Sequence, residues 1–306
     1  VKKMSIILNN ISKSYNTVKA VDDISFAVKP GELFGLIGPD GAGKTTLFRI
    51  LTTLLIQDKG NATVAGFDVL KQYKDIRNHV GYMPGRFSLY QDLTVEENLN
   101  FFATIFGTTI AENYDLIKDI YIQIEPFKDR RAGKLSGGMK QKLALCCALI
   151  HKPKVLFLDE PTTGVDPVSR KEFWEMLKRL QQKDITILVS TPYMDEAELC
   201  DRIALITNGK ILQINTPQEI IASFPKKIFK VRSSNTYKLI EDLRVYPETH
   251  SAYPFGEYLH FTPRSEAFGP MDLINYLKER RHKEIEVKET VATIEDTFMD
   301  LSKANE

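Results

Sequence analysis

The amino-acid sequence predicts an α/β protein with a smaller α+β unit in its C-terminal part. A short apolar run at residues 33–37 leads through a glycine-rich stretch into a segment with helical spacing at 45–55. Two more apolar runs, at 155–158 and 185–189, are typical of buried parallel strands. After residue 223 the pattern changes to short strands and helices in alternation. With 306 residues, 43% of them hydrophobic and 26% charged, the chain is long enough for two globular units.

The first 55 residues predict strands followed by one helix. Residues 5–8 and 18–28 alternate apolar and polar side chains and are rich in β-branched types, which indicates antiparallel strands. Gly31 then provides a turn before the strand at 33–37. The order is therefore strand, glycine-rich loop and helix, with the helix over 45–55.

A helical subdomain is expected over about residues 90–150. Thr94 followed by Glu97 forms a capping-box pattern, and Ser136 is a candidate N-cap for the last helix. We expect three helices, over residues 93–107, 111–124 and 137–150.

The α/β pattern resumes after residue 150. Between the two buried strands, Asp166-Pro167 combines a capping residue with a first-turn proline and opens a helix. Asn208-Gly209 predicts a hairpin turn, and the stretch 216–219 starts another helix. We take residues 1–222 as the main domain.

Residues 223–306 predict a small accessory domain of the ferredoxin-like α+β type. Its expected elements are strand 228–231, helix 237–243, strand pair 251–261, helix 271–281 and strand 284–287. A poorly ordered region over residues 246–256 is the alternative.

Charge and cysteine content exclude several classes. The 41 Lys and Arg nearly balance the 40 Asp and Glu, so the net charge of +1 offers no field for nucleic acid, and we expect no nucleic-acid partner. Cys146, Cys147 and Cys200 lack a metal-ligand spacing and are expected to be reduced core thiols. No run approaches the roughly 20 apolar residues that cross a bilayer, and residues 1–4 lack a signal-peptide pattern. In a membrane process, we expect a peripheral protein on the cytoplasmic face.

The glycine-rich loop fits the P-loop pattern, which holds a nucleoside triphosphate. Glycines let backbone N–H groups curl around phosphate oxygens at a helix start. Lys44 is expected to contact the β- and γ-phosphates, Thr45 to bind Mg²⁺, and Thr46 to add a phosphate hydrogen bond. ATP and Mg²⁺ are the expected ligands. The loop consists of Gly38, Pro39, Asp40, Gly41, Ala42, Gly43, Lys44 and Thr45.

Two carboxylates follow the apolar run 155–158. Asp159 is placed to hold Mg²⁺ through water. Glu160, one position later, is placed to polarise an attacking water and is the candidate catalytic residue.

Residues 135–139, Leu-Ser-Gly-Gly-Met, distinguish among P-loop families. Here the sequence resembles the ABC ATPase family, in the bacterial branch of multidrug, polysaccharide and cytochrome-maturation exporters. The resemblance implies a RecA-like core with an antiparallel β subdomain and a helical subdomain. It also implies that Ser136, Gly137 and Gly138 face the γ-phosphate held by a second ABC subunit, so that the dimer closes on ATP.

Further segments match the same family. Tyr15 stands where the family stacks an aromatic ring on adenine, although a tyrosine after a strand is more often a packing residue. Residues 161–167 match a segment that crosses the dimer interface, and 86–93 leads into the subdomain where transmembrane permease subunits dock. Residues 292–298 resemble the end of the exporter branch's accessory domain. The implied partners are permease subunits and a second ABC subunit, identical or different.

Two positions depart from the family. Gly85 replaces a glutamine that contacts Mg²⁺ and the attacking water, and Pro192 replaces a histidine that donates to the γ-phosphate. We expect an exporter subunit that binds ATP-Mg²⁺, hydrolyses it weakly at its own site, and completes a partner's site with its signature. The alternatives are tolerated substitutions with full activity, a non-hydrolysing regulatory subunit, or a soluble non-transport ABC protein. The last would carry tandem cassettes with a basic linker, or a long coiled-coil insertion, which the sequence lacks.

Overall fold

The computed structural model describes residues 4–85 and 89–303, and its backbone contacts divide the chain into two compact units. The first unit is Val1–Pro217 and the second is Gln218–Glu306. The division falls directly after Pro217, the first residue of helix α7 (Pro217–Ala222), five residues earlier than the boundary expected from the sequence.

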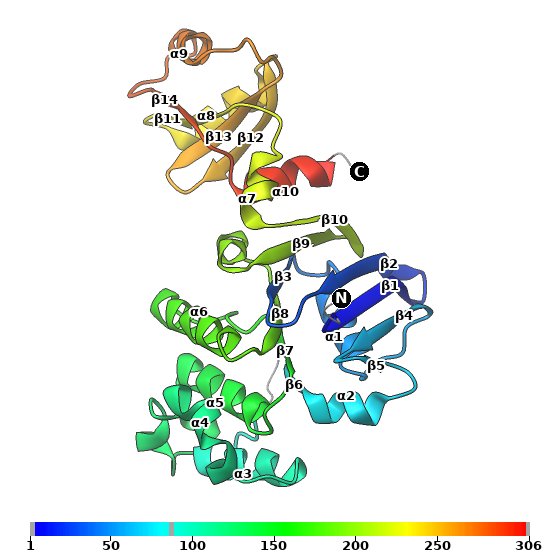
Figure 1. The fold of residues 1–306 in the computed structure, drawn as a ribbon. Coiled ribbons are helices and arrows are strands. Elements are labelled where there is room, and N and C mark those ends of the chain that lie inside the picture. Colours follow the sequence, from blue (N-terminus) through cyan, green and yellow to red (C-terminus); the bar gives the residue numbers. More distant parts are fainter. Residues whose placement is uncertain (1–3, 86–88, 304–306) are drawn as a thin grey trace. The chain divides into compact units, whose positions relative to one another are not determined.

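A six-stranded sheet forms the centre of the first unit, in the order β10-β9-β3-β8-β7-β6 (Figure 1). All neighbours pair in parallel except β10, which is antiparallel to β9. Every residue of β3, β7 and β8 is buried, as expected for parallel strands covered on both faces. The strands are β3 (Leu33–Ile37), β6 (Val80–Met83), β7 (Val155–Asp159), β8 (Thr186–Thr191), β9 (Arg202–Thr207) and β10 (Lys210–Asn215).

A second, antiparallel sheet has the order β2-β1-β4-β5. Its first strand runs to Tyr15, well beyond the predicted residues 5–8, because it continues through register shifts after Leu8, next to Asn10 with φ 51°. The short strands β4 and β5 were not predicted. The strands are β1 (Ile6–Tyr15), β2 (Val18–Val28), β4 (Lys59–Val64) and β5 (Phe67–Asp68).

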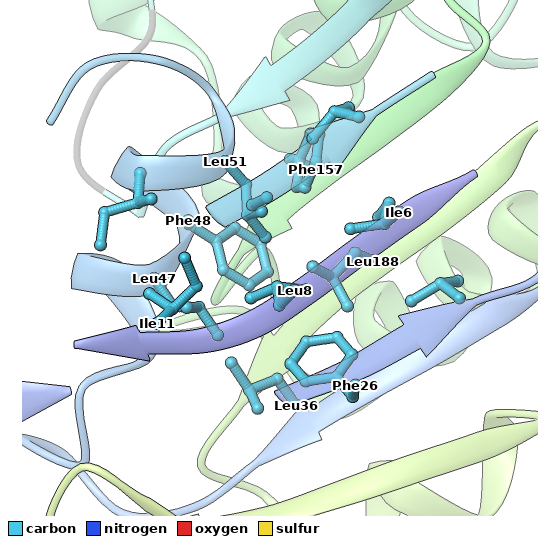
Figure 2. Packing of buried hydrophobic residues seen from close by; sticks show 14 of the residues in the cluster. Ile6, Leu8, Ile11, Phe26, Leu36, Leu47, Phe48, Leu51, Phe157 and Leu188 are labelled. Atoms are coloured by element: carbon cyan, nitrogen blue, oxygen red, sulfur yellow. The ribbon is translucent and has the colours of Figure 1, made fainter. Parts of the chain in front are cut away.

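Helix α1 (Lys44–Leu51) packs in the core shared with both sheets (Figure 2). The Phe48 ring meets Phe157 of β7 edge-on at 5.8 Å between ring centroids. Burying a phenylalanine contributes roughly 1.5–3 kcal/mol, so this contact fixes the helix on the sheet. The expected helix over 45–55 is too long: Thr52 is its C-cap, and Thr53 has φ 63°, which is outside the helical region.

Four of the remaining helices of the first unit, α3 to α6, begin at side chains that cap their first turn, whereas α2 does not. The Thr94–Glu97 capping box is present at α3, and Thr109 with Glu112 forms a second one at α4. Asp166 accepts hydrogen bonds from the first turn of α6. The helices are α2 (Tyr73–His79), which was not predicted, α3 (Val95–Ile105), α4 (Ile110–Tyr121), α5 (Gly137–Leu149) and α6 (Pro167–Gln181).

The three cysteines are free and buried. Burial raises the pKa of each thiol, so all three stay protonated and act as small apolar side chains.

The second unit has its own four-stranded antiparallel sheet, in the order β12-β13-β11-β14, with a core that includes Phe229, Leu259 and Phe261. Residues 249–255 form strand β12, which contradicts the alternative of poor order over 246–256. Helix α10 was not predicted. The elements are β11 (Ile228–Arg232), α8 (Thr236–Val245), β12 (Thr249–Phe255), β13 (Tyr258–Pro263), α9 (Pro270–Glu279), β14 (Glu286–Thr290) and α10 (Ile294–Lys303).

Within the described residues, none of the helices has the length and hydropathy that a bilayer-crossing segment requires.

Candidate functional site

The loop at residues 38–43 is pressed between neighbouring backbones. A Cβ added to Gly38 would lie 2.0 Å from the carbonyl oxygen of Ile206, and one added to Gly43 would lie 2.1 Å from that of Ala20. Gly43 also has φ 103°, a conformation that L side chains rarely adopt. Glycine is therefore required at both ends of the loop, and the loop is tied to β9 on one side and β2 on the other.

Helix α1 begins at the end of this loop without a capping side chain. Gly43 is its N-cap and makes no side-chain hydrogen bond, and no acidic residue stands in the first turn. The first N–H groups of a helix lack partners within the helix, and together with the helix dipole they favour an anion. The loop and the helix start form a cradle that fits phosphate.

The Lys44 side chain lies inside this cradle, only 3% exposed. Its ammonium donates to the carbonyl oxygens of Gly38 at 2.8 Å and Pro39 at 2.9 Å. The same nitrogen lies 3.1 Å from Oε1 of Glu160. The structure therefore brings the loop lysine and the candidate catalytic carboxylate into direct contact.

Asp159 and Glu160 lie where β7 ends, and Ser190 of β8 holds both. The Ser190 hydroxyl donates to Oδ1 of Asp159 at 2.7 Å, because the two residues are paired in the parallel register. The Glu160 N–H donates to the carbonyl oxygen of Ser190 at 3.1 Å and lies 3.0 Å from its hydroxyl oxygen. Sequence reasoning missed Ser190, although a polar residue at the end of a buried strand was a usable signal.

Tyr82 of β6 lies near Asp159. Burial and the nearby Asp159 carboxylate raise the pKa of Tyr82 to about 12, against the opposing effect of Arg49. The phenol therefore stays protonated in the physiological range and adds no charge beside Asp159.

The residues around the loop fit a magnesium–nucleotide ligand. The Thr45 and Thr46 hydroxyls on α1 and the buried carboxylate of Asp159 are oxygen donors of the kind that Mg²⁺ binds. Since β3, β8 and β7 are adjacent and parallel, their carboxyl ends meet at one edge of the sheet. Thr45 and Thr46 lie on the helix that follows β3, and Asp159 is the last residue of β7.

Gly85 and Pro192 both border this edge. A Cβ at Gly85 would lie 3.0 Å from the carbonyl oxygen of Asp159 and 3.9 Å from Cβ of Glu160, so the position adjoins the acids and offers no side chain. Pro192 follows Thr191, whose carbonyl accepts from the Gly38 N–H at 3.3 Å. Residues 86–88 of the segment expected to lead to a docking surface lie outside the described residues.

The signature residues lie elsewhere, at the start of α5. Ser136 is the N-cap, and its hydroxyl accepts from the Met139 N–H at 3.3 Å. A Cβ at Gly138 would come within 2.8 Å of the Ser169 hydroxyl, so this helix tip packs directly on the start of α6. No hydrogen bond or ion pair of the described residues joins positions 136–138 to the loop at 38–46.

Tyr15 is the last residue of β1 and pairs with Val18 across a tight turn. Its side chain is 44% exposed, and in the described part of the chain it has no hydrogen bond to the loop. Adenine stacking by this ring stays a prediction.

Comparison with known proteins identifies a family. The model of the ABC transporter family matches residues 21–163. A probable multidrug ABC transporter ATP-binding protein of Escherichia coli (strain K12) is 39% identical over 307 residues, covering 97% of this chain and 52% of that protein. This chain thus spans about half the length of that relative. Nod factor export ATP-binding protein I of Rhizobium sp. (strain N33) is 37% identical over 248 residues, covering 80% of this chain and 82% of the relative.

A solved structure of the ATP-binding subunit of an ABC transporter has the same fold. It superposes with a TM-score of 0.66 at 27% identity and covers 72% of this chain and 93% of that one. The expected recognition and fold class are both confirmed. With a P-loop, paired acids and a serine-glycine helix tip in these positions, the chain belongs to the family of ABC transporter ATP-binding proteins.

Proposed function

We propose that this chain is the ATP-binding subunit of an exporter, acting on the cytoplasmic face of the membrane. The observation that carries the proposal is the Lys44–Glu160 contact at 3.1 Å. This contact supports the proposal because it joins the loop expected to bind a triphosphate to the carboxylate proposed to activate water. A purely structural glycine-rich turn requires no such carboxylate.

Each residue of the site has a distinct role in this proposal. The loop N–H groups and Lys44 bind the phosphates, Thr45 and Asp159 hold Mg²⁺, and Glu160 accepts a proton from the attacking water. The metal neutralises phosphate charge when bound. Ser190 orients both carboxyl residues through its hydroxyl and carbonyl groups.

The proposal includes a dimer, because the signature lies apart from the chain's own loop. Ser136, Gly137 and Gly138 present a capped helix start beside the 161–167 segment. A helix start of this kind suits a γ-phosphate. A second ABC subunit, identical or different, would supply the phosphate that this tip contacts.

Asymmetry between the two sites follows from Gly85 and Pro192. Neither position can donate a side-chain hydrogen bond, and proline has no backbone N–H. Removing one group that stabilises transition-state charge costs about 10²- to 10³-fold in kcat. The chain's own site would hydrolyse ATP slowly, while its signature serves a competent site on the partner.

Transmembrane permease subunits are the proposed membrane partners. A cavity of about 430 Å³ lies between the sheet and the helical subdomain, with Tyr82 and Phe106 in its lining. Leu54 and Ile105, also in the lining, are largely exposed. An apolar helix from a permease subunit fits such a lining. Export as the direction rests on the names of the multidrug and Nod factor relatives.

Nucleotide binding and turnover by the purified chain test the proposal. We expect Mg-ATP to bind and Lys44→Ala to weaken that binding at least about tenfold, because the variant loses a buried phosphate contact. We expect slow turnover that Gly85→Gln with Pro192→His accelerates. Lys183→Ala is the matched control, because it removes a lysine that is exposed and lies outside the loop.

A regulatory subunit without turnover is the second candidate, favoured by the same two substitutions. It predicts binding without hydrolysis, even in the doubly substituted chain. Absence of any heat of association with Mg-ATP would overturn both candidates, and unchanged turnover after the double substitution would overturn the asymmetry.

A further inference from the structure

A buried carboxylate lies behind the site, on the short 3-10 helix Met194–Leu199 that follows β8. Glu196 is only 2% exposed. Its Oε2 accepts from the Thr191 hydroxyl at 2.5 Å and from the Thr162 hydroxyl at 3.1 Å. Its Oε1 accepts from Nε of Arg170 at 3.0 Å. One carboxylate therefore ties together the end of β8, the segment after the acids and helix α6.

The buried Glu196 carboxylate is paired with Arg170 and accepts hydrogen bonds at both of its oxygens. Arg170 also contacts the exposed Asp195 at 3.1 Å, and its guanidinium lies 4.2 Å from the centroid of the Tyr193 ring. A charge taken out of water is tolerated only when it is paired and hydrogen-bonded. The geometry at Glu196 meets that condition at both oxygens.

Glu196 reaches the candidate catalytic residue through a short turn. The Thr163 N–H donates to the Glu160 carbonyl at 3.2 Å, and the Val165 N–H donates to the Thr162 carbonyl at 3.2 Å. Glu196 anchors this turn by accepting the hydrogen bond from the Thr162 hydroxyl. Glu160 itself has φ 51°, a left-handed conformation that persists only where the surroundings enforce it.

The second anchor of Glu160 is the adjacent end of β8. Ser190 accepts the Glu160 N–H, and Thr191, the next residue, bonds to Glu196. The Thr191 carbonyl also accepts from Gly38 of the loop. The two restraints on Glu160 and the start of the phosphate loop thus converge on one carboxylate.

We infer that Glu196 is a positioning residue, which holds Glu160 in its strained backbone conformation and links the 161–166 segment to β8 and the phosphate loop. This inference rests on the proposed function for its catalytic consequence. The positioning itself can be measured without nucleotide. A purely structural role would change stability without changing the turn at 160–166 selectively.

Glu196→Gln is the test, with Asp195→Asn as the matched control. Both carboxylates contact Arg170, but the side chain of Asp195 is 73% exposed and bonds to neither threonine. The amide keeps the shape of Glu196, loses its charge, and can accept at only one of its two terminal atoms. We expect hydrogen exchange in peptides covering 160–166 to accelerate about tenfold in Glu196→Gln and to stay unchanged in Asp195→Asn.

The catalytic readout uses the Gly85→Gln, Pro192→His background. There Glu196→Gln is expected to lower kcat about ten- to a hundredfold while the affinity for Mg-ATP stays unchanged, because a displaced Glu160 affects chemistry more than binding. If Glu196→Gln does not fold, Thr162→Val, which removes only one of the contacts, is expected to accelerate exchange over 160–166 by a smaller factor.

The possible results separate the two proposals. Unchanged exchange over 160–166 in the folded variants would overturn the inference, whatever the turnover. Failure of the parent chain to bind Mg-ATP would overturn the proposed function, and the exchange measurement would still test the positioning.

Discussion

Single residues of the phosphate loop are constrained by what surrounds them. Gly43 combines a left-handed φ of 103° with a carbonyl oxygen 2.1 Å from where a Cβ would lie. Gly41 has a similar φ of 80°, but nothing lies within 4 Å of its Cβ position. A side chain at Gly41 would therefore introduce backbone strain alone, whereas one at Gly43 would introduce both strain and a steric clash.

Gly43→Ala is expected to weaken Mg-ATP binding more than about tenfold, because both strain and collision displace the loop. Gly41→Ala introduces only the strain, roughly 1–2 kcal/mol in the folded state. Isothermal calorimetry and thermal unfolding of both variants measure the difference. Equal losses of affinity in the two would contradict a role for the close approach to Ala20.

At the scale of elements, the site depends on how α1 is fixed to β7. The edge-on contact between Phe48 and Phe157 holds the helix whose start forms the phosphate cradle against the strand that carries the acids (Figure 2). Packing and binding geometry are linked here, because a shift of α1 along the sheet also moves Lys44.

Phe157→Ala is expected to lower the free energy of unfolding by about 3–5 kcal/mol, as for other buried aromatic truncations. Urea unfolding followed by circular dichroism measures it. Phe101→Ala in α3 is the control, because that ring is only partly buried, and its loss is expected to be smaller. If Phe157→Ala lowered the free energy of unfolding less than Phe101→Ala, the core would have closed around the missing ring.

At the scale of the whole molecule, each of the two units has a hydrophobic core of its own. The first unit carries the site, and the second has a cluster of its own around Phe229 and Phe261. Three histidines of the second unit each bond to an aspartate: His250 to Asp300, His260 to Asp296 and His282 to Asp242. The pKa values of Asp296 and Asp300 are lowered, so acidification is expected to affect the second unit through these two carboxylates.

The pKa of Asp296 determines in which direction the stability of the second unit changes with pH. Burial alone would raise the pKa of Asp296, but hydrogen bonds from His260 and Thr293 outweigh it and hold the pKa below the ordinary 3.8. A carboxyl with a lowered folded-state pKa contributes stability above the unfolded value, and that stability is lost as pH falls through the folded pKa. We expect protection of the second unit to fall below about pH 4.

Hydrogen exchange of peptides from residues 228–290, followed from pH 5 to pH 2.5 after correction for intrinsic rates, measures this loss. Asp296→Asn is expected to show a flatter dependence, since the titrating group is absent. The same steep dependence in both chains would exclude Asp296 as its source.

The fold class and the main local elements could be predicted because their signals are short-range. The capping box at Thr94, the cap at Asp166 and the hairpin turn at Asn208 each depend on side chains within a few residues of one another. The sequence predicts too long a helix α1, because the apolar spacing continues past Thr52. The backbone, however, leaves the helical region there. Strands β4 and β5 do not stand out in the sequence, because pairing makes them strands: β4 pairs with β1, and β5 pairs with β4.

The sequence by itself determined the family, and it predicted the phosphate loop and the two positions that depart from the family pattern, because those signals lie in contiguous residues. Only the tertiary structure decided that Ser190 holds Asp159, that Lys44 meets Glu160, and that Glu196 joins three segments. These contacts join residues that are far apart in the chain: residues 159 and 190 are 31 positions apart, 44 and 160 are 116 apart, and 162 and 196 are 34 apart. Such pairings depend on the strand order of the sheet, and the spacing within any one segment does not specify that order.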